Sequence, residues 1–112
     1  MISPRKILFW SLLVDDEPSL AKLGARLLER NGYQVTSLTN PEEALEIIKK
    51  DPFRFQLVIS DQLMPQMTGD KLLDSILEIN PDVKTIICSG NIDKVDQNIV
   101  EKVGVEFVLK KP

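Results

Sequence analysis

Short runs of apolar residues alternate along the chain with segments in which apolar residues recur every three or four positions. The short runs are typical of buried β-strands, and the longer period is typical of helices with one apolar face. Strands are predicted at residues 7–14, 33–38, 57–60, 85–88 and 105–109. A helix is predicted after each strand but the last, and the fourth helix covers 92–103 with Gly104 as its C-cap.

Residues that start or stop helices support the first two helical segments. Pro18 suits the first turn of a helix, and Asn31-Gly32 ends the same pattern. Asn40-Pro41 combines a side chain that caps helices with a favoured first helical residue. The apolar residues at helical spacing are expected to be core, including those of the first helix, Leu20, Leu23, Leu27 and Leu28.

The alternation of strands and helices predicts an α/β fold. Apolar strands that alternate with helices form a parallel sheet covered on both faces, and right-handed crossovers then make a doubly wound sheet the simplest topology. A doubly wound sheet of five strands normally has a fifth helix, whereas the sequence stops at Pro112. Two alternatives remain open here: the chain is a piece of a longer protein, which we favour, or a second subunit covers an exposed apolar face.

Composition excludes several classes of function. The 112 residues suffice for one domain, and no apolar run has the roughly 18 residues that a membrane span needs. The net charge of -3 argues against a broad nucleic-acid surface. The chain has no His, which excludes His-based metal sites and Ser-His-Asp or Cys-His nucleophiles. Cys88 is the single cysteine, so no internal disulfide forms, which fits a reducing cytoplasm.

Polar residues stand where the predicted strands end. They are Asp15 and Asp16, Asp61, Ser89, and Lys110 or Lys111. The carboxyl ends of parallel strands share one edge of the sheet, so these residues are expected to converge. Crowded carboxylates repel one another unless a cation lies among them, and carboxylates with water and a carbonyl are typical Mg²⁺ ligands. We therefore predict a Mg²⁺ site beside a carboxylate nucleophile, with hydroxyl and ammonium donors for a phosphoryl group.

The same residues resemble the motifs of a known family. The sequence is similar to the receiver domains of two-component response regulators over about residues 5 to 112. The resemblance implies a flavodoxin-like sheet of order 2-1-3-4-5 and a single receiver domain, 1–112, without its last helix. It is carried by Leu12-Leu13-Val14-Asp15-Asp16-Glu17-Pro18, Asp61-x-x-Met64-Pro65-x-Met67-x-Gly69, Ser89-Gly90 and Lys111-Pro112.

The resemblance also implies a role for each acidic residue. Asp61 is expected to be the phosphoacceptor, which attacks a phosphohistidine or a small phosphodonor. Asp16 and Asp61 are expected to bind Mg²⁺ directly, together with the backbone carbonyl of Leu63. Asp15 is expected to act mainly through a water molecule bound to the metal.

The donors of the site follow from the same resemblance. Lys111 is expected to pair with the Asp61 carboxylate and then with the phosphoryl group, and Ser89 to hydrogen-bond its oxygens. In the family an aromatic residue usually stands three positions before the lysine. Val108 has that place relative to Lys111, and Phe107 has it relative to Lys110. Lys110 therefore remains an alternative, although the neighbouring Pro112 favours Lys111.

The predicted function is signalling in a two-component phosphorelay. The expected partners are a sensor histidine kinase or a phosphotransfer domain, and a second copy of the chain through the uncovered sheet face. No nucleic acid or membrane is expected to bind, and the domain is expected to be cytoplasmic. It is not expected to be an enzyme beyond its own phosphorylation and dephosphorylation.

Two alternative functions were weighed against this one. An aspartyl-nucleophile Mg²⁺ phosphatase usually has a second acid two residues after the nucleophile, where this chain has Leu63. A degenerate receiver that only binds partners is disfavoured because all acidic positions are intact. An apolar Leu63 cannot orient an attacking water, so the phosphoryl group is expected to persist.

Overall fold

The computed structural model describes residues 9–89 and 107–110, in which a five-stranded parallel sheet has the order β2-β1-β3-β4-β5. The predicted doubly wound sheet and its strand order are confirmed. The predicted helix 92–103 and its cap Gly104 lie outside the described residues. The strands are β1 (Phe9–Val14), β2 (Tyr33–Leu38), β3 (Leu57–Asp61), β4 (Lys84–Ser89) and β5 (Phe107–Lys110), and the helices are α1 (Pro18–Arg30), α2 (Pro41–Lys50) and α3 (Gly69–Ile79).

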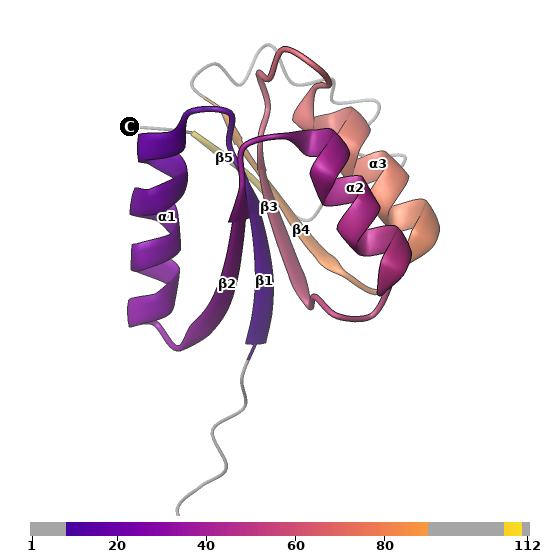
Figure 1. Cartoon of the computed structure of the whole chain (residues 1–112), viewed down its shortest axis with the longest axis horizontal. Coiled ribbons are helices and arrows are strands. Elements are labelled where there is room, and N and C mark those ends of the chain that lie inside the picture. The colour runs from indigo at the N-terminus through magenta and orange to yellow at the C-terminus, as the bar shows by residue number, and fades with distance from the viewer. Residues whose placement is uncertain (1–8, 90–106, 111–112) are drawn as a thin grey trace, which may run out of the picture.

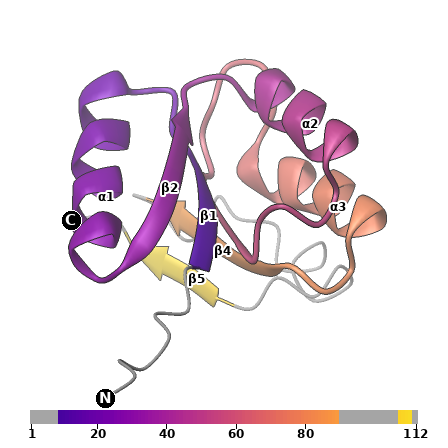
Figure 2. The same cartoon turned by 60° about the horizontal axis from the view of Figure 1, so that its bottom comes forward.

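Helices cover the two faces of the sheet unequally in the described part of the chain. α1 lies on one face, and α2 and α3 lie side by side on the other (Figures 1 and 2). The main core fills the space between α2, α3 and the sheet, because strand residues that alternate along the chain all point to that side. Its fully buried members include Leu12, Val14, Val58 and Ile87 from the strands and Ala44, Ile48, Leu72, Leu73 and Ile76 from the helices.

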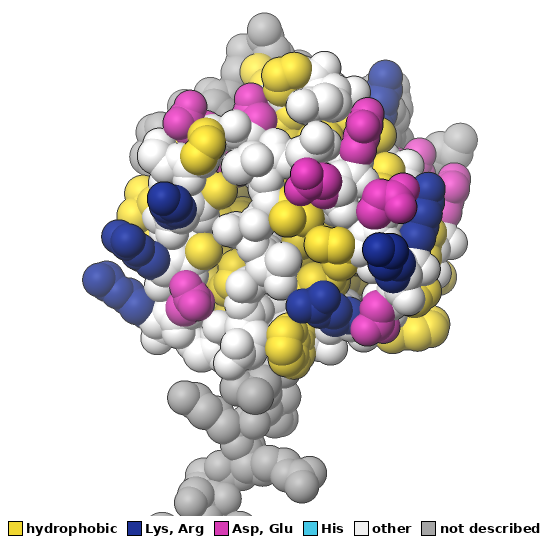
Figure 3. Space-filling model, viewed as in Figure 1, with side chains coloured by type: hydrophobic (Ala, Val, Ile, Leu, Met, Phe, Trp, Pro, Cys, Tyr) yellow, Lys and Arg dark blue, Asp and Glu magenta, His cyan; other side chains and the backbone are white. Residues whose placement is uncertain are grey.

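Three of the four leucines predicted as core in α1 are exposed, and Leu28 is half-buried. Leu20, Leu23 and Leu27 are 43%, 54% and 50% exposed, so the prediction that they are buried is wrong. The helix contacts the sheet through small residues instead: Ala21 is buried, and Gly24 lies against the Leu13 side chain. Small residues let a helix approach a sheet closely. Hydrophobic and basic side chains consequently reach the surface together over α1 (Figure 3).

The predicted signals at the ends of α1 and α2 are confirmed. Gly32 follows α1 with a φ of 91°, a left-handed conformation that favours glycine. At the start of α2 the Asn40 side chain accepts a hydrogen bond from the Glu42 N–H at 2.8 Å, as an N-cap does. Within the described ranges, no helix is both long enough and apolar enough to span a bilayer.

Candidate functional site

Three carboxylates meet at the carboxyl edge of the sheet. β1 and β3 are neighbours and Val14 pairs with Ser60, so the residues that follow this pair, Asp15 and Asp61, emerge side by side. One carboxylate oxygen from each of Asp15, Asp16 and Asp61 lies within 4.8 Å of the others. The structure thus brings together the three acids predicted from the sequence.

The donor set of this cluster fits a hard divalent cation. Two oxygens bound to one Mg²⁺ at about 2.1 Å lie at most about 4.2 Å apart, so small side-chain movements would bring all three acids to one ion. Asp15 and Asp61 are only 6% and 8% exposed. Burying carboxylates is costly without a cation or strong hydrogen bonds. The Glu17 N–H supplies one such bond to Asp15 Oδ1 at 3.0 Å and so orients that carboxylate.

The loop after Asp61 is held by backbone hydrogen bonds at both of its ends. Gln62 donates its N–H to the Cys88 carbonyl at 3.0 Å and accepts the Gly69 N–H at 2.9 Å. Met64 is buried in the core and Met67 packs against it, which fits the expected packing role of both residues. Leu63, whose carbonyl is the predicted backbone ligand, has a half-exposed side chain.

Gly69 lets α3 begin directly against the end of β3. A Cβ built on Gly69 would overlap the backbone carbonyl oxygen of Asp61, which no rotamer change could relieve. The Ser60 hydroxyl donates to the same carbonyl oxygen at 2.8 Å. The Gly at the end of the Asp-x-x-Met-Pro motif is therefore required by the close approach of two backbones.

The predicted donors differ in how far the structure describes them. Ser89 ends β4, is 1% exposed, and follows Cys88, which pairs with Asp61. Lys110 ends β5 and its backbone pairs with Ser89. Lys111 lies outside the described residues. The site lysine therefore remains a prediction.

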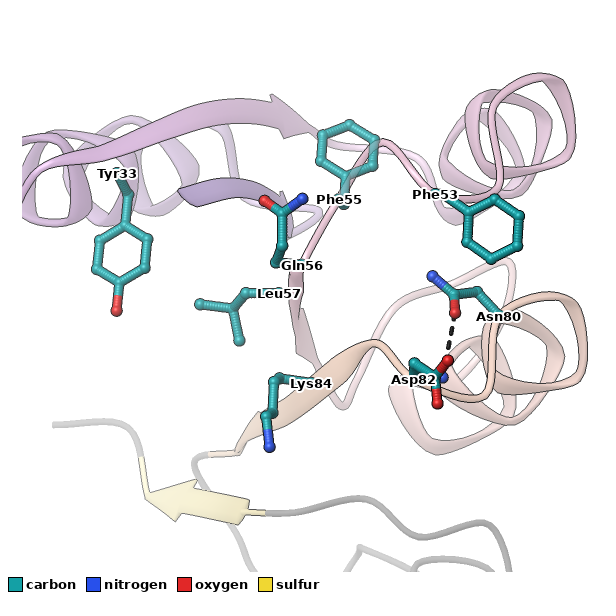
Figure 4. Close-up of a pocket in the computed structure, with 8 residues that line it drawn as sticks. All are labelled: Tyr33, Phe53, Phe55, Gln56, Leu57, Asn80, Asp82 and Lys84. Atoms are coloured by element: carbon teal, nitrogen blue, oxygen red, sulfur yellow. Dashed lines mark hydrogen bonds between the residues drawn. The ribbon is translucent and has the colours of Figure 1, made fainter. Parts of the chain in front are cut away.

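A cavity of about 440 Å³ lies at the opposite, amino edge of the sheet. Tyr33, Leu57 and Lys84, the first residues of β2, β3 and β4, border it (Figure 4). No sequence motif predicts this cavity, because the residues that line it come from segments far apart in the sequence. Its lining is Tyr33, Phe53, Phe55, Gln56, Leu57, Asn80, Asp82 and Lys84, and includes none of the residues predicted for the phosphoryl site.

Comparison with known families identifies the family to which this fold belongs. The sequence model of the response regulator receiver domain matches residues 11–112. The chain belongs to this family. The predicted resemblance is thereby confirmed, and receiver domains are signalling domains of two-component systems.

Individual receiver domains share both sequence and structure with the chain. It is 39% identical over 79 residues to the sensor kinase CckA of Brucella abortus, which is 70% of this chain and 8% of that kinase. A crystal structure of a receiver domain protein from Clostridium thermocellum has 30% identity and a TM-score of 0.85, covering 93% of this chain and 82% of that one. TrrA of Thermotoga maritima, solved in complex with Mg²⁺-BeF, has 27% identity and a TM-score of 0.81, covering 93% and 87%.

Proposed function

We propose that this receiver domain, residues 1–112, accepts a phosphoryl group on Asp61 in a Mg²⁺-dependent step of a phosphorelay. The observation that carries the proposal is the cluster of three carboxylates at the carboxyl edge of the sheet, with oxygens within 4.8 Å. A buried acid in such a cluster is a suitable nucleophile for phosphoryl transfer. The structural neighbour TrrA was solved in complex with Mg²⁺-BeF, which supports Mg²⁺ as the metal of this domain.

Transfer from a histidine kinase or phosphotransfer domain exchanges one bond to phosphorus for another. A carboxylate oxygen of Asp61 attacks the phosphorus of a phosphohistidine, and the phosphorus–nitrogen bond breaks with its electron pair left on the imidazole. Asp16, Asp61 and the Leu63 carbonyl would hold Mg²⁺ directly, and Asp15 would hold it through water. Mg²⁺ held there would supply positive charge that offsets the negative charge of the phosphoryl oxygens.

The remaining site residues stabilise the product. The buried Ser89 hydroxyl stands at the end of the strand beside Asp61 and would donate to a phosphoryl oxygen. Lys111, or Lys110 in its place, would pair first with the carboxylate and then with the phosphoryl group. Phosphorylation then shifts the equilibrium between two states of the domain, which changes its contact with a partner or output.

Two other functions are weaker. A phosphatase would need a general acid two residues after Asp61, and the side chain of Leu63 there is apolar and half-exposed. A degenerate receiver that only binds partners would not need three acids within reach of one ion. The proposed domain therefore acts in signalling and catalyses only its own phosphorylation and dephosphorylation. Its proposed location is the cytoplasm.

The exposed row of α1 supports association with a second copy. Leu20, Leu23 and Leu27 are exposed apolar residues of α1, the helix that covers one face of the sheet in the described part of the chain. Burying such a surface against its copy would remove apolar area from water. Sedimentation of the parent and of Leu23→Gln tests this arrangement: a dimer that becomes a monomer in the variant supports it, and a monomeric parent contradicts it.

The mass of the intact chain after incubation with Mg²⁺ and acetyl phosphate tests the main proposal. We expect the parent to gain one phosphoryl group, about 80 Da, and Asp61→Ala to gain none. Asp74→Ala is the control, because it removes an acid of α3 outside the cluster and should be phosphorylated like the parent. Absence of any gain in a parent that binds Mg²⁺ would contradict phosphoacceptance and favour the binding module.

A further inference from the structure

The residue directly after Asp61 reaches across to the start of α3. Gln62 is 1% exposed, although it is a polar side chain in a loop. Its side-chain Oε1 accepts the Asp70 N–H at 2.9 Å. Its backbone carbonyl accepts the Gly69 N–H, also at 2.9 Å. Gln62 thus satisfies the N–H groups of the first two residues of α3, which have no partner inside the helix.

These bonds replace the ordinary cap of the helix. Thr68 occupies the N-cap position of α3 but makes no capping bond with its side chain. Its hydroxyl donates instead to Asp70 Oδ1 at 2.6 Å, and the same oxygen accepts the Lys71 N–H at 2.8 Å. In α2, by contrast, the N-cap residue Asn40 makes its own bond. The start of α3 therefore depends on a residue eight positions earlier in the chain.

Gln62 also joins this helix to β4. Its N–H donates to the carbonyl of Cys88 at 3.0 Å, one residue before Ser89. One residue therefore connects the end of β3, the end of β4 and the start of α3. The hydrogen bonds that its carbonyl and Oε1 accept from Gly69 and Asp70 close the loop 62–69, and Leu63 is the first residue inside that loop.

We infer that Gln62 is a positioning residue, which holds the loop in the shape that presents the oxygens of Asp61 and Leu63 to a divalent cation. The inference rests on the proposed function, since it concerns the affinity of the same site. Metal ligands depend on partners that orient them, and removal of such a partner typically lowers metal affinity about 10- to 100-fold. A buried acceptor cannot be replaced by water when it is lost, so its donor remains unpaired.

The test is the Mg²⁺ dissociation constant of Gln62→Met, measured by calorimetry beside the parent chain. Methionine has a similar length, but its side chain is apolar and offers no amide oxygen. Gln56→Met is the matched control, because Gln56 Oε1 also accepts a backbone N–H, that of Trp10, at the other end of β3. We expect Mg²⁺ binding about tenfold weaker in Gln62→Met. The change in Gln56→Met should stay below about twofold, since distant sites act independently.

A second substitution at Gln62 distinguishes loss of the hydrogen bond to Asp70 from a general loss of structure. Gln62→Glu keeps an acceptor oxygen for the Asp70 N–H, but its added negative charge would itself attract Mg²⁺, so this variant is compared by hydrogen exchange alone. Hydrogen exchange of the Asp70 amide should be faster in Gln62→Met and stay slow in Gln62→Glu. If Gln62→Met does not fold, Gln62→Asn decides, because its shorter side chain keeps an amide that does not reach Asp70.

The outcomes distinguish this inference from the function on which it rests. A parent that binds no Mg²⁺ and gains no phosphoryl group overturns the proposed function. A parent that binds Mg²⁺, with Gln62→Met as tight as Gln56→Met, overturns only the role of Gln62. Weaker Mg²⁺ binding in Gln62→Met, together with exchange of the Asp70 amide that is faster in Gln62→Met and unchanged in Gln62→Glu, supports that role.

Discussion

The two glutamines that flank β3 make the same three kinds of hydrogen bond at opposite ends of the sheet. Gln56 donates its N–H to the Trp10 carbonyl and accepts the Lys84 N–H at its own carbonyl, both at 2.9 Å. Its Oε1 accepts the Trp10 N–H at 2.6 Å. Gln62 repeats this pattern at the carboxyl end, but Gln56 is exposed whereas Gln62 is buried. Of the two residues, only Gln56 is exposed enough for water to replace a lost hydrogen-bond partner. Loss of the same kind of hydrogen bond should therefore cost more stability at Gln62 than at Gln56.

The direction of the strands explains why the candidate site is at only one of these ends. In a βα unit the helix begins at the carboxyl end of its strand, so unpaired N–H groups and the positive end of the helix dipole gather there. At the amino end a cation lies over two aromatic rings. The Arg54 guanidinium lies 5.5 Å from the ring centroid of Trp10 and 5.0 Å from that of Phe55. The comparison predicts that stability and phosphorylation can be changed separately at the two ends.

The largest expected effect is a loss of stability at the amino end. Phe55 is 2% exposed and belongs to the core cluster, so Phe55→Ala should lower the free energy of unfolding by about 3–5 kcal/mol. Urea unfolding followed by Trp10 fluorescence measures the loss. Phe53→Ala is the control, because Phe53 is 71% exposed and should change stability by less than about 0.5 kcal/mol. Equal losses in the two variants would contradict the assignment of the core.

The folded fraction of Phe55→Ala should still be phosphorylated on Asp61. No residue of the carboxylate cluster contacts this end of the sheet, so the rate with acetyl phosphate should match that of the parent. If too little of the chain folds, Phe55→Leu keeps most of the apolar volume and allows the same comparison. A folded variant that cannot be phosphorylated would show that the two ends are coupled.

The next effect is expected at the carboxyl end, in Gly69→Ala. The new Cβ would overlap the Asp61 carbonyl oxygen, so stability should fall by about 1–3 kcal/mol and phosphorylation should slow. Gly24→Ala is the control: its Cβ would lie 2.7 Å from Leu13 Cδ2, the mobile end of a side chain. Alanine also favours the helix by about 1 kcal/mol over glycine, so Gly24→Ala should be neutral or stabilising. Normal phosphorylation in Gly69→Ala would refute the required close approach.

A smaller effect concerns the lifetime of the phosphorylated state. Leu63→Asn places an amide beside Asp61 that can orient an attacking water, which the apolar side chain cannot do. We expect dephosphorylation to accelerate roughly tenfold, which corresponds to about 1.4 kcal/mol in the barrier. The decay of the phosphorylated mass with time measures the rate. Leu63→Met should decay like the parent, and an unchanged rate in Leu63→Asn would remove Leu63 as a determinant of lifetime.

The smallest effect is expected within the sheet between the two ends. Thr85 is fully buried, and its hydroxyl has no hydrogen-bond partner among the residues that the structure describes. Thr85→Val removes that hydroxyl and keeps the branched shape, so stability should rise by about 1 kcal/mol. Thr85→Ser, which keeps the hydroxyl and loses a methyl group, should lower the urea midpoint instead. A lower midpoint in Thr85→Val would indicate a partner for the hydroxyl.

The sequence by itself determined the order of elements and the place of the acids. Apolar runs and helical spacing are local properties, so the strand 33–38 and the caps Asn40 and Gly32 were predicted where the structure has them. Parallel strands share one carboxyl edge, so Asp15, Asp16 and Asp61 could be placed together from their positions alone. These predictions needed only the period of the pattern and the topology that follows from it.

Only the tertiary structure decided which side of an element faces the core and which distant groups pair. The leucine row of α1 has the period of a buried face, yet the helix contacts the sheet through Ala21 and Gly24. Gln62 is one polar residue in a loop by its sequence, and its role depends on Asp70 and Cys88 being beside it. Helix rotation and long-range hydrogen bonds arise from contacts between segments, which no local pattern encodes.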